Sequence, residues 1–235
     1  MSIVIVTSHY NEDLQWLEDI NFKVFVVHHE GGKEYNVDKF YKTYTIKNKG
    51  LEASAFLHYI IENYDNLPEH VVFLHGHEQS YHHIYNKPLL YLINNAKINE
   101  YDYIPLNNSW RAYTLHREDM TILPNGLPFN KHFRANTEPL LKHLNPDKNI
   151  LIYDACAQFI VSKKLILGNS KEFYIKLYEE LMEDILKGDM FEELWHLIFT
   201  KSCILNHNHF FNNFAQPIFF DPGLCDYNVF KSFFG

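Results

Sequence analysis

The sequence predicts an α/β fold with a mixed, mostly parallel sheet flanked by helices. Two observations lead to this prediction. Short runs of β-branched residues recur along the chain, and segments with the apolar spacing of amphipathic helices lie between them. The chain has 235 residues, 46% of them hydrophobic and 16% aromatic, which suffices for one large core. We expect residues 1–205 to form a single domain and the aromatic residues 206–235 to pack on it as a tail.

The strands are expected in short apolar runs. Residues 3–7 read Ile-Val-Ile-Val-Thr, a continuous β-branched run that is typical of a strand covered on both faces. Further runs of strand character lie at 23–28, 43–47, 71–74, 103–106, 150–153 and 158–161.

The helices are expected where the apolar spacing changes to three and four residues. This spacing predicts helices over 51–64, 88–97, 171–187 and 191–199, and Pro88 suits the first turn of the second one. Residues 108–148 show little periodicity, and a loop is predicted over 121–131.

Charge and cysteine content narrow the class of protein. A net charge of −8 disfavours a nucleic-acid-binding protein, which normally has a basic surplus. No apolar run is long enough to span a bilayer, so we expect no transmembrane segment. Three widely spaced cysteines form no disulfide framework, which favours the cytoplasm. The abundance of Asn, Lys, Ile, Tyr and Phe is typical of AT-rich genomes, and the cytoplasm of a virus-infected host cell fits this composition.

Two polar segments follow predicted strands. Ser8–Asp13 comes after the first strand, and His75–Glu78 comes after the fourth. In open α/β sheets ligands bind outside the carboxyl ends of the strands. This rule picks out both segments as candidate ligand-binding positions.

His75, His77 and Glu78 are candidate metal ligands. Side chains alternate along a strand, so the two imidazoles share one face beside a carboxylate, a set that suits Mn²⁺ and, less well, Zn²⁺. The alternative is a His-rich loop, continued by His82 and His83, that binds phosphates or sugar hydroxyls without a metal.

Glu192 and His196 are candidate catalytic residues. They are four positions apart and share one face of a predicted helix, so the carboxylate can act as a general base that the imidazole orients. The alternative is a surface pair beside a core Trp195.

The segment after the first strand is a candidate nucleoside site. Tyr10, Asn11 and Asp13 offer an aromatic ring and polar groups for a base or ribose, although Asp13 also suits a helix N-cap. Trp110 and Arg111 are candidate anchors, with the guanidinium able to clamp a diphosphate or simply to be solvated. No GxGxxG, Walker or GxSxG motif is present, which removes the main support for nucleotide-dependent oxidoreductases, P-loop NTPases and serine hydrolases.

Five segments in order resemble one family. They are 10–17, 52–69, 73–77, 157–162 and 192–199, which include Phe73-Leu74-His75-Gly76-His77 and Ala157-Gln158-Phe159. This order resembles the "domain of unknown function 3431" family of fungi and large viruses, which is in turn similar to GT-A glycosyltransferases of the chlorovirus type. The resemblance implies a single-domain, GT-A-like, Rossmann-like fold. It also implies a nucleotide-sugar site at the turn 10–13 and the end of the fourth strand, with Gln158 and Glu192 near the acceptor.

One departure from the GT-A pattern concerns the metal. GT-A enzymes usually carry Asp-x-Asp at the end of the fourth strand, where this chain has His75-Gly76-His77-Glu78. Either His and Glu hold the metal, or the enzyme needs none, or the catalytic analogy fails.

The sequence thus predicts a glycosyltransferase that moves a sugar from a nucleoside diphosphate to a glycan or other hydroxyl acceptor. The alternatives are a nucleotide- or carbohydrate-binding protein without catalysis and a His-metal hydrolase. The donor, the acceptor and the oligomeric state stay open.

Overall fold

A six-stranded sheet in the order β3-β2-β1-β4-β8-β5 forms the centre of the protein. The structure is a computed structural model that describes residues 2–18, 20–33, 40–79, 87–108, 110–114, 129–144, 146, 150–205 and 210–213. The strands are β1 (Ile3–His9), β2 (Lys23–His29), β3 (Lys42–Ile46), β4 (His70–Leu74), β5 (Tyr103–Pro105) and β8 (Phe159–Ser162). β1 pairs parallel with β2 and β4, β2 pairs parallel with β3, and β8 pairs antiparallel with β4 and β5. The predicted mixed, mostly parallel sheet is confirmed.

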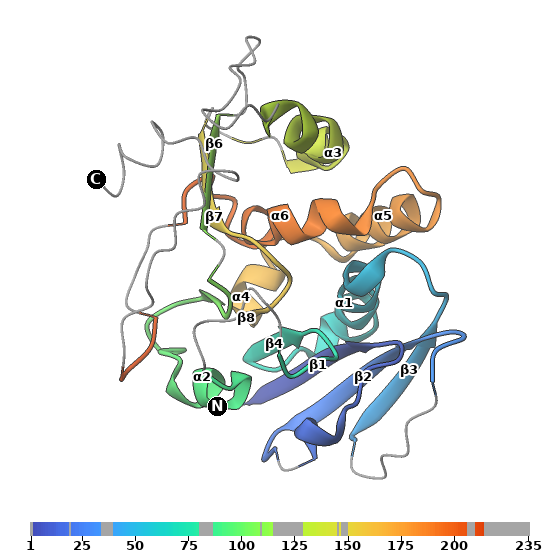
Figure 1. Cartoon of the computed structure of the whole chain (residues 1–235), viewed down its shortest axis with the longest axis vertical. Coiled ribbons are helices and arrows are strands. Elements are labelled where there is room, and N and C mark those ends of the chain that lie inside the picture. The colour runs from blue at the N-terminus through green and yellow to red at the C-terminus, as the bar shows by residue number, and fades with distance from the viewer. Residues whose placement is uncertain are drawn as a thin grey trace.

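The helices stack in layers over one face of the sheet (Figure 1). α1 (Leu51–Asn63) lies directly on the sheet, α5 (Lys171–Met182) and α6 (Gly188–Thr200) pack on α1, and α3 (Phe129–Leu144) packs on α6. A second, antiparallel sheet joins β6 (Trp110–Thr114) to β7 (Ile150–Asp154). The short elements are α2 (Leu89–Asn95), α4 (Lys163–Ile166) and the 3₁₀ turns η1 (Gln15–Leu17) and η2 (Tyr64–Asn66).

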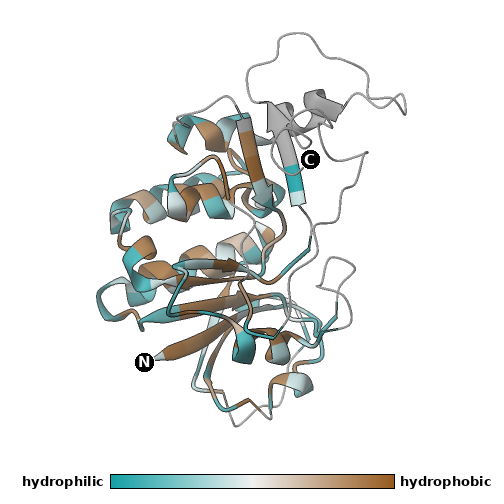
Figure 2. Ribbon diagram, turned by 90° about the vertical axis from the view of Figure 1, so that its left-hand side faces the viewer, coloured by the Kyte–Doolittle hydropathy of each residue, from teal (hydrophilic) through white to brown (hydrophobic). Residues whose placement is uncertain are grey.

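The central strands are apolar because both faces of the sheet are covered. Val4, Ile5 and Val6 of β1 are buried, as is every residue of β4. Figure 2 shows these strands as the brown centre of the molecule.

An aromatic cluster joins the sheet to α1 and α6. Phe159 of β8 contacts Phe73 of β4 at a centroid distance of 5.3 Å and Trp195 of α6 at 5.6 Å. Phe56 of α1 lies 4.7 Å from Phe73 and 5.8 Å from Trp195. Because these rings come from four elements, the cluster fixes the start of α6 relative to the sheet.

The helical region 129–144 differs from the sequence prediction. α3 begins at Phe129, so the loop predicted over 121–131 is wrong at its end, and residues 115–128 lie outside the described ones. α3 packs on α6, and its Leu140 is buried. Pro139 lies inside the helix, a position that normally argues against a helix in the sequence.

The boundary between α5 and α6 also differs. The helix predicted over 171–187 ends at Met182, because Asp184 adopts a left-handed φ of 64° that no continuing helix allows. α6 then starts at Gly188, three residues before the predicted 191.

Four residues of the predicted tail are described. Phe210 and Phe211 are buried, the former at 5.1 Å from the ring of Tyr101. The rest of 206–235 lies outside the described residues, so the tail stays a prediction. In the described part of the chain, none of the helices combines the length and apolar character that crossing a membrane requires.

Candidate functional site

The candidate site lies at the carboxyl edge of the parallel strands. β1 ends there at His9, β2 at His29 and β4 at Leu74, and α1 begins at the same edge after β3. Because β8 runs the opposite way, the turn 155–158 that precedes it also lies at this edge. The topology therefore brings together the two segments that the sequence singled out.

The turn after β1 is held by its own backbone. Glu12 Oε2 accepts hydrogen bonds from the N–H groups of Tyr10 (2.6 Å) and Asn11 (3.0 Å). The N–H of Lys33, in the turn after β2, donates to Tyr10 O (2.8 Å) and Asn11 Oδ1 (3.0 Å). Partial burial by itself raises the pKa of Glu12, but the backbone N–H groups outweigh it and the net pKa is lowered. Glu12 is therefore an anion that orders the turn.

Imidazoles fill the space behind this turn. His9 Nδ1 lies 2.8 Å from His28 Nδ1, and His9 Nε2 lies 3.0 Å from Glu12 O. His29 Nε2 lies 3.1 Å from Ser8 Oγ. Burial lowers the pKa of both His9 and His29, so these rings are neutral at neutral pH.

Two residues of the predicted site have structural partners. Asp13 is exposed and its Oδ1 accepts from Gln15 N (2.9 Å), whereas the N-cap position of η1, the alternative role predicted for Asp13, is taken by Leu14. Gly76 leaves no space for a ligand at its Cα, because a Cβ there would lie 2.9 Å from Ser8 O and 2.8 Å from the Glu12 side chain. The glycine instead lets the segment after β4 pack on the turn after β1, where Trp16 Nε1 donates to Gly76 O (2.9 Å).

The predicted metal ligands lie close together without forming a cluster. The rings of His75 and His77 are 5.6 Å apart and nearly perpendicular, and His77 and Glu78 are exposed. Within the described ranges no group of three or more His, Cys, Asp or Glu side chains is placed to hold a metal ion. His82 and His83 lie outside the described residues. Ligation of Mn²⁺ or Zn²⁺ by His75, His77 and Glu78 stays a prediction, and we derive no chemical step through a metal.

The first turns of α1 and α6 bring acidic residues together. We call Glu52, Asp189, Glu192 and Glu193 the acidic cluster. Burial, followed by the charge of Glu192, raises the pKa of Glu52 to about 8. Burial and the charge of Glu193 likewise raise the pKa of Glu192, although Arg111 acts in the opposite direction. Carboxyl groups with raised pKa values are candidates for proton transfer near neutral pH.

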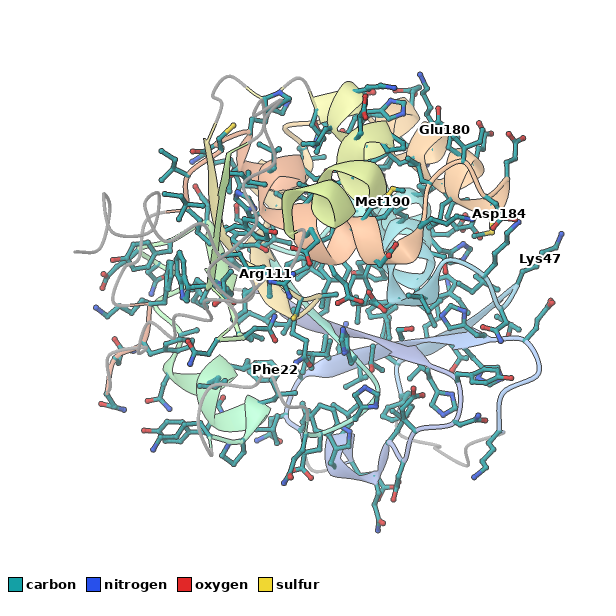
Figure 3. All side chains as sticks on the ribbon, turned by 45° about the horizontal axis from the view of Figure 1, so that its top comes forward. Phe22, Lys47, Arg111, Glu180, Asp184 and Met190 are labelled. Carbon is teal, nitrogen blue, oxygen red and sulfur yellow. The ribbon has the colours of Figure 1, made fainter. Side chains whose placement is uncertain are left out.

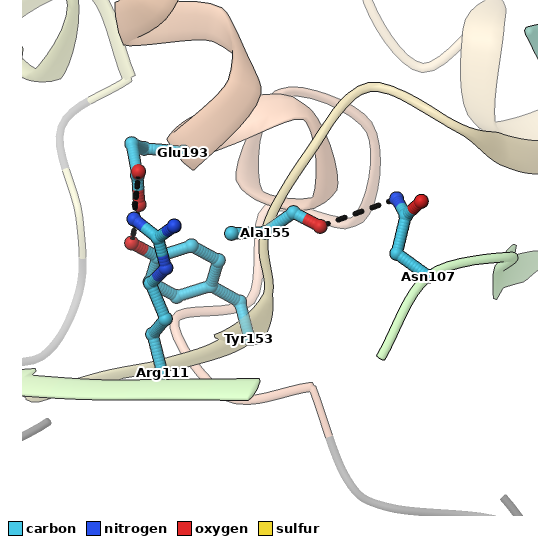
Figure 4. A network of polar contacts seen from close by, with 5 residues as sticks. All are labelled: Asn107, Arg111, Tyr153, Ala155 and Glu193. Carbon is cyan, nitrogen blue, oxygen red and sulfur yellow. Dashed lines mark hydrogen bonds and ion pairs between the residues drawn. The ribbon is translucent and has the colours of Figure 1, made fainter. Parts of the chain in front are cut away.

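Arg111 and Tyr153 anchor the acidic cluster to the second sheet (Figure 4). The Arg111 guanidinium on β6 forms an ion pair with Glu193, and the Tyr153 hydroxyl on β7 donates a hydrogen bond to the same carboxylate. Figure 3 shows Arg111 beside the strands of the second sheet. Burial raises the pKa of Glu193 even with the guanidinium beside it. Arg111 thus positions the first turn of α6, and its predicted contact with a diphosphate stays a prediction.

His196 has a core position. Its ring is buried and stacks on Tyr153 at 5.2 Å with an interplanar angle of 3°. Burial lowers the pKa of His196 to about 3, so the ring stays neutral. The groups that shift the pKa of Glu192 are Glu193, Arg111 and Asp189. The partnership of His196 with Glu192 stays a prediction, and we retain Glu192 as the candidate base without it.

Trp110 and Gln158 are also core residues, with exposed fractions of 1% and 0%. Gln158 Nε2 donates to Asn107 Oδ1 (3.3 Å), and Asn107 Nδ2 donates to Ala155 O (3.2 Å) and Gln158 O (3.1 Å). These bonds order the turn 155–158. Direct contact of Trp110 or Gln158 with a substrate stays a prediction. Cys156 is a buried core residue, and burial raises the pKa of its thiol.

Comparison with known proteins identifies the family. Residues 4–211 match the family described as "Protein of unknown function (DUF3431)". The chain belongs to this family. No curated protein matches the sequence. Among solved structures, the apo structure of the bifunctional glycosyltransferase WbbM is similar to this DUF3431 protein with a TM-score of 0.45 and 11% sequence identity. The match covers 86% of this chain and 43% of that chain, so the DUF3431 protein spans less than half of WbbM.

The sequence prediction missed three members of the acidic cluster of this DUF3431 protein. Glu52 follows Gly50 at a helix start, and Asp189 and Glu193 flank Glu192. Acidic residues in a first helical turn are common stabilisers of the helix dipole, so the local pattern does not mark them as functional. A Gly immediately before a predicted helix, followed by an acidic residue, was the one available signal.

Proposed function

We propose that this protein is a glycosyltransferase that moves a sugar from a nucleoside diphosphate to a hydroxyl acceptor. One observation supports this activity most. A carboxyl group, that of Glu192, lies at the carboxyl edge of a Rossmann-like sheet, and burial and its acidic neighbours raise its pKa. A base whose pKa lies closer to the working pH accepts a hydroxyl proton more effectively than an ordinary carboxylate.

We assign the donor to the segments after β1 and β4. The exposed Asn11, the half-exposed Tyr10 and the exposed Asp13 are the proposed nucleoside contacts. His75, His77 and Glu78, on the adjoining segment, are assigned to the diphosphate, where imidazole N–H groups donate to phosphate oxygens. Carboxyl ends of neighbouring strands are the usual ligand position of such sheets, which supports this assignment.

The reaction assigned to Glu192 is proton removal from the acceptor. As the acceptor O–H proton moves to the Glu192 carboxylate, the acceptor oxygen forms a bond to the anomeric carbon of the donor sugar. The bond from that carbon to the phosphate oxygen breaks, and its electron pair leaves with the nucleoside diphosphate. Whether the configuration at the anomeric carbon is inverted or retained is a separate measurement.

The test is a screen of UDP-glucose, UDP-galactose and GDP-mannose with and without Mn²⁺. Binding is measured by thermal shift, since a ligand at one hundred times its Kd adds about 2.7 kcal/mol of apparent stability. Release of UDP or GDP is measured with and without a mixture of simple sugars as acceptors. A transferase releases nucleotide only when the acceptor is present.

Two variants give the test its specificity. Glu192→Gln is expected to lower kcat by about a hundredfold or more while donor affinity stays within about twofold. Glu62→Gln, the same change at an exposed position of α1, is the control and should leave both unchanged. Full activity of the Glu192→Gln variant contradicts the proposal. Release without an acceptor favours the hydrolase, and binding without release favours the non-catalytic protein.

A further inference from the structure

Two helices begin side by side at the acidic cluster. A Cβ added to Gly188, the first residue of α6, would lie 2.6 Å from Gly50 O and 2.9 Å from Leu51 Cβ. The glycine therefore permits a backbone contact between the starts of α6 and α1. The contact brings Glu52, in the first turn of α1, next to Asp189 in the first turn of α6 and Glu192 at the start of its second turn.

The start of α1 has an unusual backbone. Gly50 has a φ of 80° and Leu51 has a φ of 54°, although Leu51 carries a branched side chain that disfavours this region. Leu51 is 56% exposed, so burial of its side chain does not explain the conformation. The two left-handed residues turn the chain into α1 directly before Glu52.

The Glu52 carboxyl is buried and under-satisfied. Its Oε1 is excluded from solvent, and no hydrogen-bond donor among the described residues reaches it. The charged groups that act on it are the carboxyls of Glu192 and Asp189 on α6. The nearest basic residue along the chain, Lys49, donates instead to Met182 O and forms an ion pair with Asp184. The N–H of Glu52 itself donates to the carboxyl, but this bond does not outweigh burial and the charges of Glu192 and Asp189. A buried carboxyl group that faces other carboxyl groups, with one oxygen lacking a donor, is favoured in its protonated form.

We propose that Glu52 is the second carboxyl group of a proton-sharing pair with Glu192, in which Glu52 keeps one proton at neutral pH and Glu192 is the ionised partner. This inference rests on the proposed function for its catalytic consequence, but the pair itself exists in the free protein. Glu192 is the more exposed of the two carboxyl groups and lies beside Arg111, which favours the charge on Glu192.

The pair explains how Glu192 remains a usable base. With Glu52 neutral, Glu192 carries the single charge of the pair and takes the proton of the acceptor hydroxyl. Both carboxyls are then protonated, and the pair returns one proton to water once the product leaves. Glu52 thus acts through Glu192 as a positioning residue, because it keeps a second negative charge away from the base. Near pH 8, where Glu52 loses its proton, the second charge raises the pKa of Glu192, so the slope of the wild-type pH–rate profile should change there.

The pair can be tested in the free protein by measuring stability against pH. An acid whose pKa is raised by folding binds more protons folded than unfolded, so stability is fully present below the unfolded value of 4.5 and falls until the pH reaches about 8. Glu52→Gln keeps the shape and stays neutral, so its stability should not show this fall. At pH 8 its unfolding equilibrium constant should be smaller than that of the wild type by about tenfold or more, and its Tm about 3 °C or more higher.

The controls separate the pair from a general effect of charge. Glu62→Gln on the exposed side of α1 should follow the wild-type curve. Glu192→Gln should move the fall in stability to lower pH, because it removes the charge that helps hold the proton on Glu52. If the stability of Glu52→Gln and that of the wild type depend on pH in the same way, the proposal that Glu52 holds a proton is overturned. An unshifted curve for Glu192→Gln would overturn the pair.

The catalytic consequence is tested with the donor that the screen identifies. Glu52→Gln should lack the change of slope that the wild-type pH–rate profile shows near pH 8, and Glu192→Gln should lack activity at every pH. If Glu52→Gln changes the stability curve but leaves the pH–rate profile identical to that of the wild type, Glu52 has no tie to the reaction. If the wild type transfers no sugar, the proposed function fails while the stability curves still decide the pair.

Discussion

Glu12 and Glu52 are the same residue type at the same edge of one sheet, yet their pKa values move in opposite directions. Glu12 follows β1 and has its pKa lowered. Glu52 opens α1 and has its pKa raised to about 8. Burial by itself raises the pKa of both carboxyl groups, so burial does not explain the difference.

The difference lies in the donors. Glu12 Oε2 accepts from two backbone N–H groups, whereas no donor within the described residues reaches Glu52 Oε1. Glu52 also faces Glu192 and Asp189. The positive end of a helix contributes up to about 2 kcal/mol to an anion in its first turn. The upward shift of Glu52, from 4.5 to about 8, corresponds to about 5 kcal/mol, so burial and like charge outweigh the helix dipole.

The two regions therefore have different roles. Backbone hydrogen bonds stabilise the charged Glu12 in the turn after β1, whereas the acidic cluster holds a proton. Four substitutions test this difference.

Arg111→Ala should have the largest effect on stability. It leaves the Glu193 carboxyl buried without its ion pair, a change that typically costs about 3–5 kcal/mol. Lys142→Ala is the matched control, since its pair with Glu138 is exposed and should contribute less than about 1 kcal/mol. The measurement is urea denaturation at pH 7. Adding Glu193→Gln to Arg111→Ala should recover part of the loss, and equal effects of the two alanine variants would contradict a buried pair.

Gly188→Ala should separate the starts of α1 and α6. The new methyl group would lie 2.6 Å from Gly50 O, and overpacking of this kind costs about 1–3 kcal/mol. Because the variant moves Glu52 away from Glu192, its stability should also fall less steeply with pH than that of the wild type. Gly168→Ala, where the nearest atom is Leu165 O at 3.0 Å, should cost less. A Gly188→Ala variant as stable as the wild type would show that the two helices do not need this contact.

Glu12→Gln should weaken the turn after β1 by about 1 kcal/mol at pH 7, the discounted contribution of charge-assisted hydrogen bonds at a half-exposed site. The sign of the pH dependence is opposite to that of Glu52. The lowered pKa of Glu12 contributes stability above the unfolded value of 4.5, and this contribution is lost as the pH falls through the folded pKa.

The stability of Glu12→Gln should therefore approach that of the wild type in acid, which thermal unfolding between pH 3 and pH 7 measures. Glu30→Gln, an exposed residue at the end of β2, is the control. A constant difference across this pH range would mean that the hydrogen bonds, and not the charge, stabilise the turn.

Leu51→Gly should have the smallest effect. A left-handed φ costs a branched residue about 1–2 kcal/mol, and glycine removes this cost. Glycine also makes the unfolded chain more flexible, which lowers the stability of the folded protein by about 0.5–1 kcal/mol. A gain in stability of about 0.5 kcal/mol is expected from chemical denaturation. Leu167→Gly, at an exposed residue with an ordinary φ of −70°, should instead lose stability. A loss of stability in Leu51→Gly would contradict the backbone strain inferred at the start of α1.

Much of the fold follows from local sequence. Residues 3–6 and 71–74 are apolar at every position, and this pattern indicates a strand with both faces covered. The spacing of Ala53, Phe56 and Ile60 marks α1 equally well. α3 escaped prediction although its apolar residues are spaced as in a helix, because Pro139 inside it and the turn residues Pro124, Gly126 and Pro128 before it indicate a loop.

The candidate site was predictable only in part. Glu192 was recognised because a carboxylate in the first turns of a helix, followed by an imidazole, is a readable pattern. Glu52 was not, because nothing in residues 50–54 indicates that α6 lies against them. His196 lies four residues after Glu192 in the sequence, but in the structure the His196 ring is buried and stacks on Tyr153 of β7.

Local sequence alone determined where most strands and helices form and which edge of the sheet carries polar residues, because these depend on the alternation and spacing of neighbouring side chains. The tertiary structure decided which carboxyl groups meet, which of them find backbone donors and which arginine is paired. The free energy of a charged group depends on its exclusion from water and on charges brought from distant parts of the chain. For that reason Glu12 and Glu52, indistinguishable as residues, became an anion and a proton-holding acid.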